Sequence, residues 1–203
     1  MLQEQAVAPH TLGLLKRLSP ELARHGFYLA GGTALALRLG HRLSIDLDFF
    51  SAQKFNPPSM ADALENFLDQ PPRILQQSTG SIALMIEETK IELLHYPYPL
   101  LSPLETQGGI TLASLPDNVS MKLSALAGRG SKKDFTDIAA VLQQIDLETM
   151  LSWYQQKFPN SEVFMLMKSL TWFEDAEQEP DPLFLQKQSW PEIKTRVIAS
   201  LAI

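Results

Sequence analysis

The sequence predicts an α/β fold in which a small mixed β-sheet, flanked by helices, is followed by a helical C-terminal region. Short apolar runs bounded by Gly, Pro and acidic turns crowd the first half of the chain, as strands do. The second half contains longer patterns with apolar residues at helical spacing. We place the boundary near residue 113, so residues 1–113 form a core domain and residues 114–203 the helical region.

The composition is that of an ordinary globular protein. The chain has 203 residues, of which 45% are hydrophobic and 20% charged, so it can bury a stable core without the help of disulfides or a structural metal. The absence of cysteine excludes disulfides and thiolate metal sites and fits a reducing cytoplasm. The net charge of −6 argues against a chain that wraps nucleic acid, although it permits a basic patch. No apolar stretch is long enough to span a membrane, so we expect no membrane contact.

The expected elements follow in order along the chain. Residues 9–25 predict one or two short helices, with Pro20 restarting the helix. Residues 27–30 predict a buried strand that ends at a Gly-Gly pair and opens a short helix over residues 33–39. The remaining expected elements are a strand at 44–50, a helix from Pro57 to about residue 69 capped by Ser59, strands at 73–77, 81–87 and 89–95, a loop at 97–109, two helices within 115–145, and a helical remainder with an acidic linker at 174–182.

Gly31, Gly32 and Thr33 predict a phosphate cradle. A strand that ends in Gly-Gly and opens a helix presents unpaired backbone N–H groups and the positive end of the helix dipole. Glycine lets a phosphate approach closely, and the Thr33 hydroxyl adds a donor. A Gly-Gly turn without a ligand is also common, so this turn alone does not decide the function.

Asp46 and Asp48 predict a metal site. Residues i and i+2 of a strand point to one face, so both carboxylates project together. The apolar neighbours, Ile45 among them, indicate a largely buried strand in which two adjacent anions are unfavourable. Mg²⁺ resolves this conflict because it accepts one or two carboxylates and leaves its other positions for water and phosphate. The alternative is that Arg38, Arg42 or Lys54 neutralises the pair.

Glu92 is the candidate for a third carboxylate. It is a single acid within the apolar run at residues 90–94, which is expected to be a strand. Glu87 and Glu88 compete for this position, but their place at a turn suggests solvated charges. An edge strand often carries a glutamate, so Glu92 by itself is soft support.

Together these residues resemble a known signature. Gly31-Gly32-Thr33 followed by Asp46-x-Asp48 resembles the Gly-Gly/Ser to Asp-x-Asp pattern of the DNA polymerase β-like nucleotidyltransferase superfamily. The fuller strings, residues 31–37 and 42–50, resemble more narrowly the AbiEii/AbiGii-type toxin nucleotidyltransferases of bacterial abortive-infection and toxin–antitoxin systems. A downstream block at residues 122–137 is similar to that family's Lys…Arg…Lys/Arg-Asp-x-x-Asp motif, and the resemblance covers about residues 20–145.

The resemblance implies a role for each matching residue. It implies Asp46, Asp48 and Glu92 as metal ligands and catalytic acids. The third of these acids is often Asp in the family, and the glutamate at position 92 is one methylene longer. The residues implied around the nucleotide are Gly31, Gly32, Thr33, Arg42, Ser44 and Lys122. The chain is short, so the helical C-terminal region of longer members is reduced here.

The downstream block also permits a physical reading. Lys122 and Arg129 lie seven residues apart on the flank of a buried helical stripe, where they can bind phosphates or merely pack their stems on the core. Asp134 fits a capping box with Ser131 and is expected to point inward toward a cation, so it would orient that cation without touching the nucleotide or the metal. Asp137 has a weaker claim of the same kind.

Two further sets of residues are expected to be structural. His41 is expected to be a surface loop histidine. The aromatic residues at helical spacing are expected to lie in the core and not to stack on bases. They are Trp153, Tyr154, Phe158, Trp172 and Phe173.

The expected function is Mg²⁺-dependent transfer of a nucleotidyl group from a nucleoside triphosphate to an acceptor hydroxyl. The resemblance suggests a toxin that acts on tRNA or a related target and has a cognate antitoxin protein. Two alternatives stay open at this stage. One is a nucleotide- or protein-binding module on the same fold without turnover, and the other is an interaction protein whose Asp pair is charge-compensated.

Overall fold

The computed structural model describes residues 1–68 and 71–201. It contains a seven-stranded sheet in the order β3-β4-β5-β2-β1-β7-β6. β1 pairs antiparallel with β2 and parallel with β7, and β2 pairs parallel with β5, so the sheet is mixed as expected. The strands are β1 (Tyr28–Leu29), β2 (Leu47–Ser51), β3 (Arg73–Ser78), β4 (Ser81–Ile86), β5 (Thr89–His95), β6 (Glu105–Gln107) and β7 (Ile110–Leu112).

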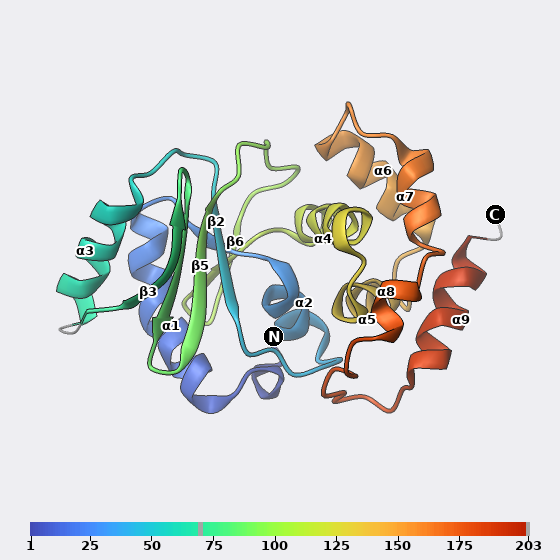
Figure 1. The fold of residues 1–203 in the computed structure, drawn as a ribbon, viewed down its shortest axis with the longest axis horizontal. Helices are drawn as coiled ribbons and strands as arrows, with labels where there is room; N and C mark the ends of the chain where they lie inside the picture. The colour runs from blue at the N-terminus through green and yellow to red at the C-terminus, as the bar shows by residue number, and fades with distance from the viewer. Residues whose placement is uncertain (69–70, 202–203) are drawn as a thin grey trace.

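The helices form two groups around this sheet. α1 and α3 cover one face, and the helices that follow the last strand gather on the other side (Figure 1). α2 runs from the end of β1 into the space between the sheet and the second group (Figure 1). The helices are η1 (Glu4–Ala6), α1 (Pro9–Arg24), α2 (Gly31–Leu39), α3 (Pro57–Leu68), α4 (Leu115–Arg129), α5 (Lys132–Val141), α6 (Leu147–Lys157), α7 (Val163–Ser169), α8 (Glu174–Glu177) and α9 (Trp190–Ser200).

Two hydrophobic cores correspond to the two groups. One lies between the sheet, α1 and α3, and includes Leu18, Phe49 and Ile91. The other lies among the C-terminal helices around Phe135. Leu35 of α2 packs into this second core, so the N-terminal half of the chain contributes to both. The domain boundary near residue 113 stays a prediction.

Strand alternation in β2 and β5 creates the surface on which the site is built. Leu47 and Phe49 are fully buried against the first core, whereas Asp48 between them is only partly buried and points the other way. The same alternation in β5 buries Ile91 and Leu93 and leaves Glu92 on the open side. The sequence pattern therefore places one acid from each strand on the same face.

Several expectations about individual elements are wrong. α1 is a single helix, which the expectation of one or two helices allowed, but it continues through Pro20, so the expected restart there is wrong. The side chain of Asn56, and not that of Ser59, caps α3, because Asn56 Oδ1 accepts a hydrogen bond from Ser59 N at 3.0 Å. Part of the expected linker at 174–182 is the short helix α8. The predicted end of the helix near residue 69 lies outside the described residues.

The expected loop at 97–109 is wrong in its last part, because residues 105–107 form the first strand of a hairpin. β6 and β7 pair antiparallel around Gly108 and Gly109, which both have positive φ values, 58° and 81°. A Gly-Gly pair between two short polar and apolar runs is a hairpin signal.

Among residues 1–68 and 71–201, no helix is both long and apolar enough to cross a bilayer.

Candidate active site

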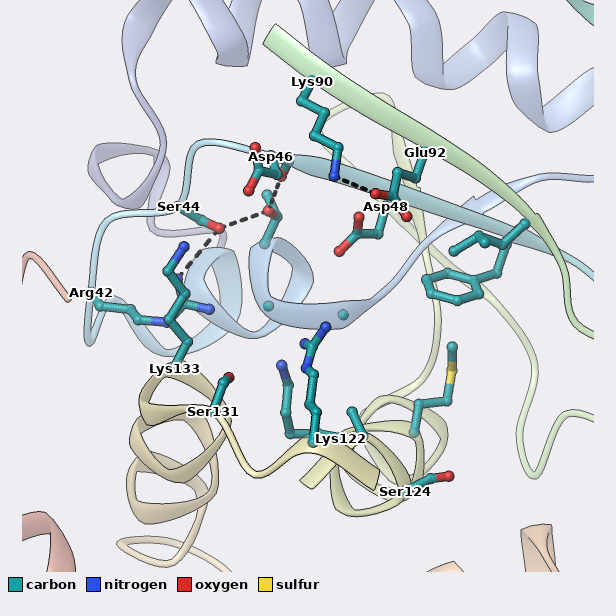
Figure 2. Close-up of a pocket in the computed structure, with 18 of the residues that line it drawn as sticks. Arg42, Ser44, Asp46, Asp48, Lys90, Glu92, Lys122, Ser124, Ser131 and Lys133 are labelled. Atoms are coloured by element: carbon teal, nitrogen blue, oxygen red, sulfur yellow. Dashed lines mark hydrogen bonds and ion pairs between the residues drawn. The ribbon is translucent and has the colours of Figure 1, made fainter. Parts of the chain in front are cut away.

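A cavity of about 750 Å³ lies between the open face of the sheet and the helices α4 and α5. The three predicted acids come from the sheet side, and Lys122 faces them from α4 (Figure 2). Every residue predicted to touch nucleotide or metal lines this cavity; Asp134 lies behind it. These lining residues are Gly31, Gly32, Thr33, Arg42, Ser44, Asp46, Asp48, Glu92, Lys122 and Arg129.

Asp48 and Glu92 are direct neighbours across the sheet. They are register partners in the parallel pairing of β2 with β5, so their side chains leave the sheet side by side. Asp46 is not on the strand, because β2 begins only at Leu47. Ile45 is 54% exposed, so the expectation that this segment is buried on both sides of Asp46 is also wrong. Asp46 and Asp48 thus lie on either side of the residue at which β2 begins.

Asp48 carries charge that its surroundings do not neutralise. Burial, with the nearby charges of Glu92 and Asp46, raises the pKa of Asp48 to about 6, while Lys122 and Arg129 act in the opposite direction. Within the described residues, neither Asp46 nor Asp48 forms an ion pair.

The arginines proposed as alternative partners are engaged elsewhere. Arg38 donates to Glu105 at 2.9 Å, and Arg42 donates to Asp137 at 2.7 Å. Lys54, the third candidate, forms no ion pair with a carboxylate of the described residues, so none of the three residues named in the charge-compensated alternative pairs with Asp46 or Asp48.

Glu92 does have a cationic partner. Lys90 Nζ forms an ion pair with Glu92 Oε1, and this bond is the main cause of the raised pKa of Lys90. Both side chains are partly solvent-accessible, so the pair can open at small energetic cost. Sequence analysis did not identify Lys90 as part of the cavity. Its position two residues before Glu92, on the same strand face, was the available signal.

The carboxylates fit a divalent cation only in part. Within residues 1–68 and 71–201, no group of three or more His, Cys, Asp or Glu side chains is arranged to hold a metal ion. The unpaired Asp46 and Asp48 nevertheless offer the one or two carboxylates that Mg²⁺ accepts from proteins. Glu92 can join them only after it leaves Lys90. The three-acid metal site stays a prediction.

The Gly-Gly turn opens α2 directly against these groups. Gly31 has φ +67° and begins the helix, and a Cβ there would lie 3.0 Å from Asp48 Oδ2. A Cβ on Gly32 would lie only 2.3 Å from Arg42 Nη2. The two glycines therefore admit the side chains of Asp48 and Arg42 as well as leaving room for a phosphate.

Thr33 supports the backbone of the segment that carries Asp46. Thr33 is 2% exposed, and its hydroxyl lies 2.8 Å from Ser44 Oγ and donates to the backbone oxygen of Asp46. Because this hydroxyl is already used, Thr33 holds the Asp46 segment in place and has little capacity left as a phosphate donor. Ser44 takes part in the same contact.

A buried network of cations and carboxylates forms the opposite wall. Arg42 donates through Nε and Nη2 to the two oxygens of Asp137, at 2.7 and 3.0 Å. Lys122 Nζ lies 2.9 Å from Asp134 and 2.9 Å from Asp137. Arg129, which is largely exposed, makes two hydrogen bonds to Asp134 at 2.8 and 3.1 Å. The expected inward orientation of Asp134 and its capping box with Ser131 are confirmed.

The electrostatics of this network favour the ionised forms. Burial raises the pKa of Asp137, but Arg42 and Lys122 outweigh it and hold the pKa well below its ordinary value. The pKa of Asp134 falls to about 2, because its bonds to Arg129 and the charge of Lys122 exceed the effect of burial. Lys122 stays protonated, since the same two carboxylates raise its pKa.

His41 belongs to this network, and its predicted surface position is wrong. Its ring is completely buried, and Nε2 lies 2.7 Å from Asp137 Oδ1. Asp137 thus gathers His41, Arg42 and Lys122, a larger role than its sequence position indicated. One aromatic expectation is also wrong, because Trp172 is 57% exposed, whereas Tyr154 and Phe158 are buried as expected.

Lys133 is a cation within the downstream block at residues 122–137 that was not assigned to the site from the sequence. It lines the cavity from the first turn of α5 and is exposed. No carboxylate of the described residues lies within ion-pair distance of it. Its ammonium group therefore remains available to a phosphate, unlike that of Lys122. Figure 2 shows Lys133 near Arg42 on one side of the cavity.

The mixed sheet, the acids of β2 and β5 and the glycine turn of α2 define the class: the chain has the fold of a nucleotidyltransferase. Solved structures agree with this class. JHP933 from Helicobacter pylori superposes with a TM-score of 0.61 at 19% identity, covering 99% of this chain and 92% of that one. The antibiotic-resistance factor ANT(2″)-Ia has a TM-score of 0.53 at 12% identity, covering 72% of this chain and 90% of that one.

The family follows from sequence. Residues 13–199 match the family described as nucleotidyl transferase AbiEii toxin, type IV toxin–antitoxin system, so the chain belongs to the AbiEii nucleotidyltransferases. An uncharacterized protein of Aquifex aeolicus is 37% identical over 159 residues, which are 75% of this chain and 76% of that protein. The match extends well beyond residues 20–145, so the short C-terminal helices also belong to the family pattern.

Proposed function

We propose that this nucleotidyltransferase is Mg²⁺-dependent and transfers a nucleotidyl group from a nucleoside triphosphate to the hydroxyl of an acceptor such as tRNA. The observation that supports it best is the pair Asp46 and Asp48, which has no cationic partner among the described residues. Two unneutralised carboxylates beside a helix N-terminus suit a metal–triphosphate complex. A bound Mg²⁺ would supply positive charge to the phosphates.

Each wall of the cavity has a distinct role in this proposal. Asp46 and Asp48 would hold the metal, and the exposed cations Arg129 and Lys133 would bind the β- and γ-phosphates. Lys122 adds a fixed positive charge from the opposite wall. Positioning and charge neutralisation of this kind supply most of the rate of phosphoryl transfer.

Glu92 is the proton acceptor in this proposal. As the acceptor oxygen bonds to the α-phosphorus, its proton passes to Glu92 and the bond to the β-phosphate breaks, which releases pyrophosphate. Glu92 must leave Lys90 to do this, and the partial exposure of that pair keeps the exchange inexpensive. Lys90 then remains beside the reaction centre as a further positive charge.

The biological context we propose is that of a toxin with a cognate antitoxin. The description of the family supports this context, because it names a toxin of a type IV toxin–antitoxin system. Induced expression of the chain in a bacterial host should stop growth, and Asp46→Asn should relieve the arrest. An arrest by the Asp46→Asn variant equal to that by the wild-type chain contradicts a toxicity based on nucleotidyl transfer.

The direct test is incorporation of label from each of the four nucleoside triphosphates into total tRNA, with and without Mg²⁺. Asp46→Asn should lower the rate by about 100-fold or more, because it removes a charge that positions the metal. Asp62→Asn, on the exposed side of α3, is the matched control and should leave the rate unchanged. Circular dichroism should show the same fold in all three proteins. Wild-type activity in Asp46→Asn refutes the proposal.

The ion pair of Glu92 with Lys90 favours a second candidate, a module that binds nucleotide without turnover. Thermal shift with each triphosphate separates the two readings. A Mg²⁺-dependent shift without any labelled product would favour the binding module. Lys90→Met frees Glu92, so it should raise a low transfer rate if this pair is what limits the enzyme.

A further inference from the structure

A second, smaller pocket adjoins the candidate active site. Its volume is about 320 Å³, and Ser124 of α4 lines both cavities. Figure 2 shows Ser124 on the side of Lys122 that lies away from Arg42 and Lys133. The second pocket therefore opens from the end of the site opposite these cations. Its lining residues, which we call the aromatic pocket, are Tyr98, Ser124, Tyr154, Phe158, Pro159, Asn160 and Ser161.

The aromatic pocket is built from rings that pack on one another. The rings of Tyr98 and Phe158 are 4.9 Å apart, and those of Tyr154 and Phe158 are 5.2 Å apart. Tyr154 and Phe158 are buried, whereas Tyr98 is 42% exposed. An exposed ring supported by buried rings offers a flat apolar surface without exposing the core. Asn160 and Ser161 add polar groups at its edge.

The loop that carries Tyr98 is held firmly. Lys157 Nζ donates to the backbone oxygen of Pro99 at 2.9 Å and to Asp117 at 2.6 Å. Asp117 in turn accepts from Leu101 N at 3.0 Å. Lys157 and Asp117 are both fully buried, so this contact is costly to break. Tyr98 is thus preorganised, which lowers the entropy cost of binding a ligand against it.

Strand β5 connects Glu92 to the aromatic pocket. β5 carries Glu92 and Leu94 on one face, and Tyr96 follows directly after the strand; all three line the larger cavity. Tyr96 contacts Tyr98, with ring centroids 4.8 Å apart. Tyr96 therefore links the wall that carries Glu92 to Tyr98, whereas Lys133 lies on the other side of the larger cavity (Figure 2).

We propose that the aromatic pocket is an acceptor subsite that stacks a nucleobase next to the acceptor hydroxyl. The inference rests on the proposed function, in which Glu92 receives the proton of that hydroxyl. A nucleobase fits because it is planar, stacks on tyrosine and has polar edges that Asn160 can contact. The Ser161 hydroxyl already donates to Phe158 O at 2.7 Å, so toward the base it can only accept. A nucleobase can also come from the nucleoside triphosphate, and binding measurements distinguish the two sources.

The test measures binding, so it does not require turnover. A fluorescent short single-stranded RNA with a free 3′ hydroxyl and the four nucleoside triphosphates with Mg²⁺ are titrated separately. Tyr98→Ala should weaken RNA binding about tenfold, which is the loss expected for one stacked base. Tyr98→Phe keeps the ring and should bind like wild type. Trp172→Ala removes another exposed aromatic residue that lines neither pocket and serves as the control.

Each outcome decides the assignment. Weaker triphosphate binding with unchanged RNA binding places the donor base in the pocket and overturns the acceptor assignment. Equal RNA affinity for wild type and Tyr98→Ala, or no RNA binding by wild type, also overturns it. Ser124→Tyr, which fills the junction of the cavities, should weaken RNA binding while triphosphate binding persists. If RNA binding depends on Tyr98 but no label is transferred, the proposed function and the acceptor role fail, and the aromatic pocket stands only as an RNA-binding site.

Discussion

Gly32 shows how a single missing side chain shapes this site. Arg42 Nη2 lies 2.3 Å from the position of a Cβ on Gly32, closer than any ordinary contact. Arg42 is only 3% exposed and its guanidinium is held by two bonds to Asp137, so it cannot swing aside cheaply. The sequence suggested glycine for the sake of a bound phosphate. The packing adds a second requirement that only the folded chain reveals.

We therefore expect Gly32→Ala to destabilise the protein by about 1–3 kcal/mol through overpacking. It should also lower the transfer rate, because Arg42 and the start of α2 must shift. Urea unfolding and the labelled transfer assay measure the two effects. Gly13→Ala in α1 is the matched control, since a Cβ there meets nothing within 4 Å. That change should raise stability by about 0.5–1 kcal/mol. Equal stability for the two variants contradicts the argument.

At the scale of elements, α4 and α5 act as one unit. Lys122 and Arg129 of α4 both bind Asp134, which also accepts from Ser131 N as part of the cap of α5. One carboxylate thus closes the turn between two helices and fixes two cations at the cavity.

The titration of Asp134 gives a prediction with a definite sign. Its pKa is about 2 in the folded chain, against an ordinary value of 3.8, so the native state binds fewer protons than the unfolded chain between these values. This contribution, about 2 kcal/mol, is fully present above pH 4 and is lost as the pH falls toward 2. Urea unfolding of wild type and Asp134→Asn between pH 2 and pH 7 measures it. The difference in stability should be large at pH 7 and shrink below pH 4; a constant difference refutes the assignment.

At the scale of the whole molecule, the loop before β2 joins the two halves of the chain. Leu43 N donates to Leu183 O at 2.8 Å, and Leu185 N donates to His41 O at 3.0 Å. Arg42 reaches α5 through Asp137 in the same region. The site therefore lies where the sheet and the helical region meet, and it depends on both.

How much the sequence predicts depends on the range of the contacts involved. Local periodicity placed Asp48 and Glu92 on strands, and a family motif marked Lys122 and Asp134 as functional. The buried contact of His41 with Asp137 was missed. The two residues are 96 positions apart, and the local sequence around either one does not indicate that they meet. The hairpin at 105–112 was missed for another reason. Its strands have three residues each, too few to show alternation, although the Gly-Gly turn between them was a usable signal.

The shared site predicts that the two halves unfold together. All three tryptophans, Trp153, Trp172 and Trp190, lie in the helical region, so their fluorescence reports on that region, whereas far-UV circular dichroism reports on the whole chain. In urea the two signals should therefore change at one midpoint. Asp137→Asn removes the carboxylate that ties Arg42 to α5, and it should lower stability by about 3–5 kcal/mol because buried cations lose their partner. It should also separate the two midpoints. Two midpoints already in the wild-type chain would show that the halves are independent domains.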